Sequence, residues 1–335
     1  MSTPHPPGGP AAARYAVHGL AVDSDIALGK PHRDLPAADV TLRTTTALHP
    51  VGDDAPRGTV VAELALGAQH LYTAVDDGDR YVLRIHSVCD FVIDRSLEVV
   101  ECQVVAGADP ELVSLLVRGA LLAFLLGLGG ACVLHASAVE SDGGSVAFAA
   151  GSGMGKSTVA ALACRDGARF VCDDLLRLSG HARPRWVGRS SELRLRAGAV
   201  PLADAHLDRW SARDTVDGRV ALTPPPSAAE DGVIDAVVIP APTRTGDTVV
   251  VTPLGPVEAT LALSAFPRLM WTLPSALGVQ FDGVSRLASS AAVLHVTIPW
   301  GPPFAPGLGA EVVRRALDAA AATAARSGGG PSSSS

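Results

Sequence analysis

A phosphate-binding loop occupies residues 149–158, where the sequence reads AAGSGMGKST. The usual motif is G-x-x-x-x-G-K-[ST], and Ala150 replaces its first glycine. In such a loop backbone N–H groups face a β-phosphate, the lysine bridges the β and γ oxygens, and the hydroxyl residue binds Mg²⁺. We therefore expect ATP and Mg²⁺ as cofactors, a metal contact from Ser157, and nucleotide contacts from Gly151, Ser152, Gly153, Met154, Gly155, Lys156, Ser157 and Thr158.

Two adjacent carboxylates, Asp173 and Asp174, follow the apolar run ARFVC. One carboxylate can hold Mg²⁺ while the other accepts the proton of an attacking hydroxyl, a division that favours a kinase over a plain ATPase. We expect Asp173 as the metal ligand and prefer Asp174 as the base, although the sequence leaves this order open. In the alternative interpretation, one Asp caps a turn and the other is solvated.

A third candidate catalytic residue is His135, inside the otherwise apolar segment VLHASAV. Its segment is predicted to be a strand beside the loop strand, so the imidazole is expected to lie near the loop. A histidine in such a setting is as often a hydrogen-bonded core residue as a catalyst.

The block VLHASAVESDGGSVAFAAGSGMGKSTVAALACRDGARFVCDDLLRL, residues 133–178, resembles the catalytic core of the HPr serine kinase/phosphorylase family and its shorter relatives. The histidine strand, the loop, an Arg-Asp-Gly-Ala step and the Asp pair occur in the order and spacing of that family. This resemblance implies an ATP-dependent kinase acting on a serine-type hydroxyl, with a fold related to phosphoenolpyruvate carboxykinase. His135, Asp173 and Asp174 take the catalytic roles in this interpretation.

Beyond the Asp pair the sequence departs from the family, since the segments that engage HPr are not found. In the stretch SSELRLRAGAV, Glu192 is a candidate further Mg²⁺ ligand, and Arg194 or Arg196 a candidate phosphate contact. An alternating strand with a solvated face explains the same stretch. The shorter relatives are associated with peptide natural-product clusters, so the expected acceptor is a serine of a ribosomal precursor peptide or of another peptide or protein.

Two other functions stay open at this point. One is a nucleotide-binding, non-catalytic scaffold for a peptide-modifying enzyme, and the other is carboxykinase-like phosphotransfer to a small molecule. Binding alone does not require the Asp pair together with His135, so these residues favour the kinase.

The elements around the loop predict an α/β fold. The alternating run SVAFA reads as a strand, VAALAC as the loop helix and ARFVC as a buried strand, which is the order of a βαβ unit. Short alternating segments predict a mostly β region upstream, and Asp109 with Pro110 marks a helix start. We expect disorder at 1–13, a β-rich region at 14–108, an HPr-kinase-like P-loop kinase domain at 109–325, and a flexible tail at 326–335.

The composition of the chain limits the classes of binding partner that we expect. The chain has 27 Lys and Arg against 34 Asp and Glu, a net charge of −7, so we expect no nucleic-acid partner. The apolar stretch 119–134 is interrupted by glycines and is predicted to be a buried helix and strand, so we expect no membrane partner. Five cysteines without metal spacing and no signal sequence favour a cytoplasmic protein, and an oligomer is compatible with the sequence.

Overall fold

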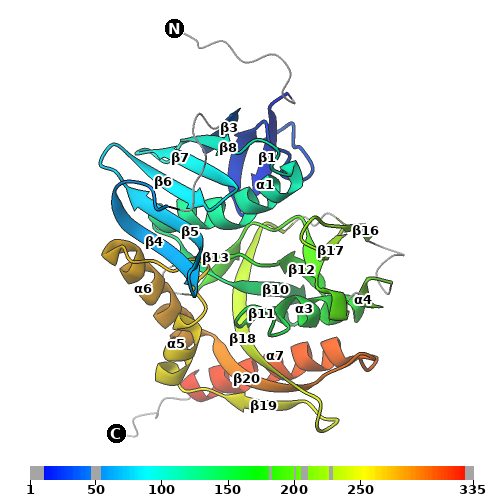
Figure 1. The fold of residues 1–335 in the computed structure, drawn as a ribbon. Helices are drawn as coiled ribbons and strands as arrows, with labels where there is room; N and C mark the ends of the chain where they lie inside the picture. The colour runs from blue at the N-terminus through cyan, green and yellow to red at the C-terminus, as the bar shows by residue number, and fades with distance from the viewer. Residues whose placement is uncertain are drawn as a thin grey trace, which may run out of the picture. The chain divides into compact units, whose positions relative to one another are not determined.

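The computed structural model describes residues 11–46, 54–180, 183–199, 201–204, 210–225 and 229–328. The expected disordered start and flexible tail lie largely outside these residues. The chain is a mixed α/β protein that divides into two compact units (Figure 1). Unit 1 comprises Met1–Gly129 and Leu269–Leu277, and unit 2 comprises Gly130–Arg268 and Gly278–Ser335.

Unit 1 is built on an eight-stranded sheet in the region where the sequence predicts a mostly β structure. The strand order is β1-β2-β3-β8-β7-β6-β5-β4, and β3 pairs in parallel with both β2 and β8. The strands are β1 Ala13–Val17, β2 Leu20–Ser24, β3 Val40–Thr46, β4 Thr59–Leu66, β5 Gln69–Asp76, β6 Arg80–Ile85, β7 Cys89–Asp94 and β8 Val99–Val104.

The apolar helical segment belongs to unit 1. It comprises α1 (Pro110–Leu116), a π-helical turn (Val117–Leu121) and α2 (Leu122–Leu128), and Phe124 stacks on Trp271 of the same unit. The domain boundary placed at 108/109 therefore differs from the structural one, which follows this segment. Within the described part of the chain, only this segment is long and apolar enough to cross a membrane, and 67% of its most apolar stretch is buried.

Unit 2 contains a nine-stranded sheet that branches at its longest strand, β18. One path runs β12-β10-β11-β18-β14-β13-β9, and β20 pairs with both β18 and β19. The strands are β9 Cys132–Leu134, β10 Ala136–Ser141, β11 Gly144–Ala149, β12 Arg169–Cys172, β13 Leu176–Ser179, β14 Arg185–Val187, β18 Asp231–Thr243, β19 Val250–Pro253 and β20 Ala292–Pro299. A three-stranded sheet is formed by β15 Leu193–Leu195, β17 Val220–Thr223 and β16 Ser211–Asp214.

Four strands of the large sheet run in the same direction. β11 pairs in parallel with β18, which pairs in parallel with β20. β10 is antiparallel to both β11 and β12, so β12 points the same way as β11. The carboxyl ends of all four strands consequently meet at one edge, where open α/β sheets bind their ligands.

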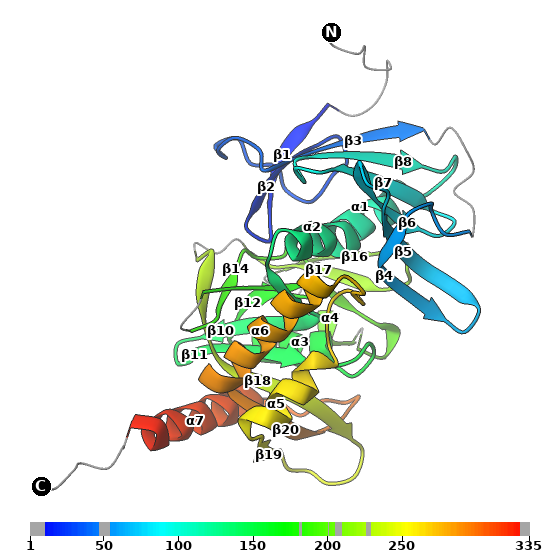
Figure 2. The ribbon, with the colours of Figure 1, turned by 90° about the vertical axis from the view of Figure 1, so that its left-hand side faces the viewer.

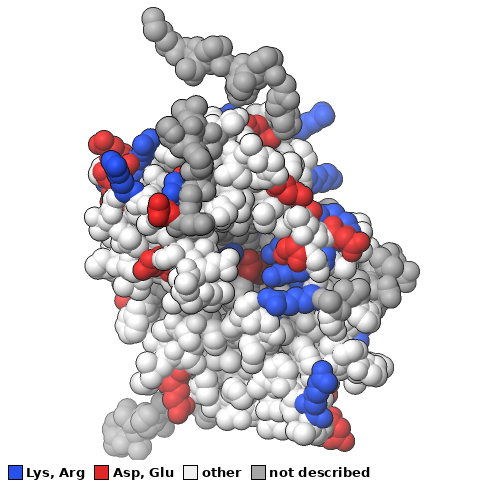
Figure 3. Space-filling model, viewed as in Figure 1, with Lys and Arg blue, Asp and Glu red and all other residues white. Residues whose placement is uncertain are grey.

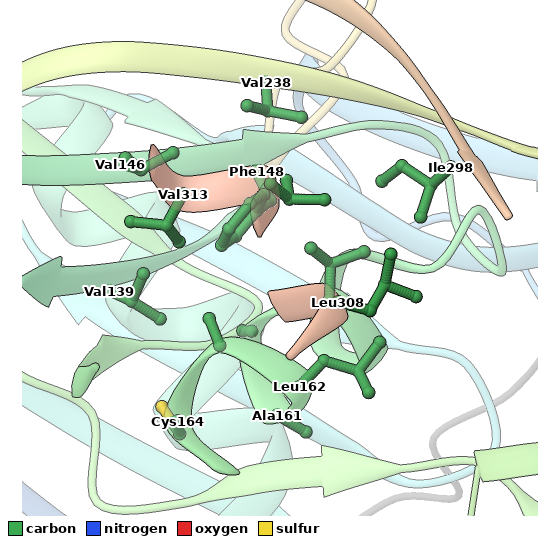
Figure 4. Close-up of a cluster of buried hydrophobic side chains, with 14 of the residues drawn as sticks. Val139, Val146, Phe148, Ala161, Leu162, Cys164, Val238, Ile298, Leu308 and Val313 are labelled. Carbon is green, nitrogen blue, oxygen red and sulfur yellow. The ribbon is translucent and has the colours of Figure 1, made fainter. Parts of the chain in front are cut away.

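Helices cover both faces of this sheet. On one face α3 (Lys156–Arg165) and α7 (Leu308–Gly328) enclose a core that includes Val146, Phe148 and Val313 (Figure 4). On the other face, α5 (Pro256–Ser264) and α6 (Pro274–Ser290) lie over the strands and contribute to a second core (Figure 2). Two short helical segments, a 3-10 turn Ala197–Ala199 and α4 Pro201–Asp204, complete the described elements.

The end of α3 is tied to the start of α7 by Asp166. Its carboxylate accepts the backbone N–H of Gly309 at 2.8 Å and of Ala310 at 3.2 Å, which satisfies donors in the first turn of α7. Arg165 pairs with the same carboxylate at 2.8 Å. The Arg-Asp step of the sequence block therefore has a structural role, which fixes the loop helix against the C-terminal helix.

Candidate functional site

The phosphate loop connects β11 to α3, as the sequence predicts. Gly153 and Gly155 have φ angles of 81° and 91°, in the left-handed region that glycine adopts without a steric penalty. Lys156 begins α3, is only 6% exposed, and donates from Nζ to the carbonyl oxygens of Ala150 at 2.8 Å and Gly151 at 3.0 Å. Burial lowers the pKa of Lys156 from 10.5 to about 8, even though the nearby Asp carboxylates act in the opposite direction.

Asp173, at the carboxyl end of β12, faces the loop. Its Oδ1 accepts the hydroxyl of Ser157 at 2.8 Å and that of Ser137 at 2.6 Å, while Oδ2 accepts the backbone N–H of Arg194 at 3.0 Å. The backbone N–H of Asp173 in turn donates to Ser190 Oγ at 3.0 Å. Three hydrogen bonds to the carboxylate and one from the backbone therefore hold Asp173 against the first turn of α3.

Asp174 points to different partners, because its backbone turns into the left-handed region with φ of 72°. Its carboxylate lies 3.1 Å from Nδ1 of His135 and accepts a hydrogen bond from Arg268 at 2.9 Å. The backbone carbonyl of Asp174 also lies 3.1 Å from the same Nδ1. Since a carbonyl only accepts hydrogen bonds, this geometry assigns a proton to Nδ1.

The charges around Asp174 keep it ionised. Burial acts to raise the pKa of this carboxyl, but the Arg268 guanidinium and the hydrogen bond from His135 hold it well below the ordinary 3.8. Arg268 is positioned by a short segment beside β9, in which Phe266 accepts the N–H of His135 and Arg268 donates its own N–H to Val133. Backbone contacts thus fix both partners of Asp174.

A pocket of ≈ 330 Å³ opens over the loop and the two carboxylates. Burial and the neighbouring Arg194 lower the pKa of Arg219 in its wall, a sign of crowded positive charge. Figure 3 shows Lys and Arg side chains gathered, with acidic ones among them, close to where Figure 1 shows β12 and β17. The charged residues lining the pocket are Lys156, Arg194, Arg196, Arg219, Arg244, Asp173 and Asp174.

The oxygen donors in this pocket suit Mg²⁺. Ser157 Oγ and Asp173 Oδ1 lie 2.8 Å apart and so present two oxygen ligands at one point. Within the described ranges no three His, Cys, Asp or Glu side chains gather into a cage that holds a metal unaided. Magnesium in phosphotransfer sites characteristically takes one or two protein oxygens and completes its shell with substrate phosphates and water.

Most of the residues predicted from the sequence come together here. His135, Ser152, Gly153, Gly155, Lys156, Ser157, Thr158, Asp173 and Asp174 all line the pocket. Gly151 and Met154 are not among the described lining residues. The Gly151 carbonyl instead receives the lysine, and the Met154 side chain is 47% exposed.

The candidate residues of the stretch SSELRLRAGAV have different surroundings. Glu192 accepts a hydrogen bond from Arg213 at 2.7 Å and is not among the described residues that line the pocket, and its role as a metal ligand stays a prediction. Both candidate arginines do reach the pocket: Arg196 donates to Ser152 Oγ at 2.9 Å, and Arg194 pairs with Asp217 at 3.2 Å. In β15 the buried leucines alternate with Arg194, and Arg196 follows the strand with the same spacing. This alternation directs both arginines away from the leucines and toward the site.

Several site residues were not predicted. Ser137 lies two residues after His135 in a segment predicted to be a strand. Because side chains two residues apart in a strand share one face, its presence beside His135 could have been predicted. Arg268 and Trp300 carry no local signal, because only the pairing of distant segments brings them to the site. The missed residues are Ser137, Arg219, Arg244, Arg268, Trp300 and Phe304.

No protein-family model matches the chain, and no curated protein matches it. One similar solved structure is the Hpr(Ser) kinase/phosphatase from Coxiella burnetii, with 14% sequence identity and a TM-score of 0.31 over 58% of this chain and 96% of that one. A likeness of this size carries no argument about the reaction, so we base the function on contacts within this chain.

Proposed function

We propose that this chain is an ATP-dependent phosphotransferase that moves the γ-phosphoryl group to a hydroxyl acceptor. One observation supports this most directly. Asp173 lies 2.8 Å from the loop hydroxyl of Ser157, while the adjacent Asp174 faces the same pocket with different partners. A protein that only binds a nucleotide needs the first carboxylate for its metal, whereas the second is suited to orient and deprotonate an attacking hydroxyl.

The loop and its arginines bind the polyphosphate. Lys156 exchanges its carbonyl partners for β and γ oxygens, and the start of α3 adds its backbone N–H groups and its dipole. Arg194 and Arg196 line the same pocket and add positive charge that the γ-phosphate requires as it leaves. Ser157 and Asp173 would hold Mg²⁺, and the ion would supply positive charge to the phosphate oxygens.

Asp174 is the group that receives the acceptor hydroxyl. A carboxylate with a lowered pKa is a weak base, yet phosphoryl transfer passes through a loose transition state in which little proton transfer is needed before bond cleavage. Its ionised oxygen orients the hydroxyl and takes the proton late. His135 acts through Asp174, whose carboxylate and carbonyl both accept its Nδ1 proton, and is therefore a positioning residue.

The acceptor we propose is a serine-type hydroxyl of a ribosomal precursor peptide or of another peptide or protein. The support for this choice is the family resemblance of residues 133–178, not a peptide groove. A cytoplasmic site of action fits the five cysteines, which are all free and buried. The negative net charge argues against nucleic acid as partner.

The test is transfer of labelled γ-phosphate from Mg-ATP to a panel of serine peptides, free serine and nucleosides, with products identified by the added mass of one phosphoryl group. We expect Asp174→Asn to keep nucleotide binding and to lose transfer by about 100-fold or more. The matched control is Asp318→Asn, an exposed carboxylate of α7 that pairs only with Arg314 among described residues and should transfer normally.

Three results would contradict the proposal. Normal transfer by Asp174→Asn with intact binding would remove the role of this carboxylate. Tight ATP binding with no acceptor found in the panel or in cell extracts would favour the non-catalytic scaffold, and ATP consumption stimulated by a small carboxylic acid would favour carboxykinase-like chemistry.

A further inference from the structure

An aromatic pair lines the phosphate pocket at its edge away from the carboxylates. Trp300 follows β20 directly, and its backbone N–H donates at 2.8 Å to the carbonyl of Thr243, the last residue of β18. The ring of Phe304 meets the indole edge to face, with ring centres 5.3 Å apart. Both side chains are half-buried and line the same pocket as Lys156.

The indole lies directly against the phosphate loop. A Cβ added at Gly155 would lie 2.5 Å from the ring, so the glycine is what allows this approach. Trp300 therefore covers the start of α3, from which Ser157 and Thr158 also face the pocket.

The order of the strands places the aromatic pair opposite the acids. Along the sheet the sequence is β12, β10, β11, β18, β20, with the Asp pair after β12, the loop after β11 and Trp300 after β20. Adjacent strands lie about 4.8 Å apart, so the strand that precedes the acids and the strand that precedes the indole each lie roughly 10 Å from the loop strand, on opposite sides of it. A nucleotide whose γ-phosphate meets the acids must extend its nucleoside the other way.

We propose that Trp300, supported by Phe304, is the stacking platform for the base of the bound nucleotide. This inference rests on the proposed nucleotide site and adds the part of it that receives the nucleoside. The half-buried indole lines the pocket, and a ring of this size offers the large π surface on which bases stack. Phe304 packs against it with the two ring planes at 86°, a contact that holds the indole in place.

The platform recognises the face of the base, not its edge. The neighbouring residues Gly301, Pro302 and Phe304 have side chains without hydrogen-bond donors or acceptors. Stacking tolerates different bases because each has a π face. Trp300 is consequently expected to contribute equally to the binding of adenine and guanine nucleotides.

The test compares Mg-ATP, Mg-GTP and Mg-tripolyphosphate by titration calorimetry on the full chain. Trp300→Leu keeps an apolar side chain for packing and removes the π face. We expect it to weaken ATP and GTP by about 5- to 100-fold and to leave tripolyphosphate unchanged. Trp300→Phe should recover most of the loss, and Phe281→Leu, an exposed ring on α6 outside the pocket, is the matched control that should bind like the wild type.

Each other outcome overturns the platform in a recognisable way. Equal affinity of the wild type for ATP and tripolyphosphate would contradict the base site but would leave the proposed phosphate site intact. Unchanged ATP binding in Trp300→Leu would do the same, and a loss for ATP without a loss for GTP would contradict recognition by stacking. Absence of binding by both ligands in the wild type would instead remove the nucleotide site itself.

Discussion

The buried Lys156 makes a quantitative prediction about nucleotide affinity and pH. Its pKa in the free protein is lowered from 10.5 to about 8, chiefly by burial. A bound polyphosphate supplies negative charge to this ammonium group and raises its pKa again, so binding requires the protonated lysine. Affinity for Mg-ATP should therefore be nearly full at pH 7 and should fall as the pH rises through 8.

The size of the effect follows from the protonated fraction of the lysine. With a pKa of about 8, roughly nine-tenths of Lys156 is charged at pH 7 and roughly one-tenth at pH 9. The Kd for Mg-ATP should consequently rise about 10-fold between these two values, provided that the bound lysine stays protonated. An unperturbed lysine, with a pKa near 10.4, would change the Kd by only about 4% over the same interval.

The assay is titration calorimetry with Mg-ATP from pH 7 to pH 9.5, in buffers of matched ionic strength. Lys156→Arg is the control, because a guanidinium stays charged across this range and its affinity, even if lower, should not depend on pH. Phosphate oxygens finish titrating near pH 7, so they add little above it. A wild-type Kd that stays constant up to pH 9 would refute either the burial of Lys156 or its contact with the phosphates.

Three further predictions concern stability, measured by chemical denaturation. Gly155→Ala should lower the free energy of unfolding by about 1 to 3 kcal/mol because of its left-handed backbone, and by more because the new Cβ would clash with the indole. The control is Gly130→Ala, which has a φ of 83° and open space at its Cβ and should lose only the backbone contribution. Asp166→Ala removes the acceptor at the start of α7 and should lose about 1 to 2 kcal/mol without changing the pH dependence of ATP binding. Arg268→Gln should lower the free energy of unfolding by about 1.5 to 3 kcal/mol at pH 7. Because Arg268 lowers the pKa of Asp174, this stabilisation is present above pH 4. The difference from wild type should therefore shrink as the pH falls below 4.

The loop and the Asp pair were predictable because their signals are local. A strand, a glycine loop and a helix follow one another without interruption, and the physical requirements of a phosphate are met within ten residues. Asp173 and Asp174 end the next strand, and parallel strands deliver their carboxyl ends to one edge. The sequence could therefore anticipate that the loop and the carboxylates meet.

The remaining site residues depend on long-range pairing. Arg268 lies 94 residues from Asp174 and reaches it only because residues 266–268 lie beside β9. Trp300 depends on β20 pairing with β18, which no local pattern specifies. Glu192, which the sequence predicts as a metal ligand, accepts a hydrogen bond from Arg213, 21 residues away in the chain, a contact that no local pattern specifies.

The helix Pro110–Leu128 shows why the domain boundary was misplaced. Its start was readable from Asp109, whose carboxylate accepts the N–H of Glu111 at 2.7 Å. The sequence does not predict which of the two units this helix packs in, because an apolar helix is compatible with either core. Contacts with Tyr81 and Trp271, from segments on both sides in sequence, decide that it belongs to unit 1.

The left-handed backbone at Asp174 has a consequence for how such a protein can change during evolution. Asn and Gly adopt this conformation readily, and both are reached from an Asp codon by one base substitution. Either change would remove the Asp174 carboxylate while leaving the turn, Asp173 and the loop in place. Under the proposed function, a single base substitution is therefore enough to convert a phosphotransferase into a protein that only binds its nucleotide.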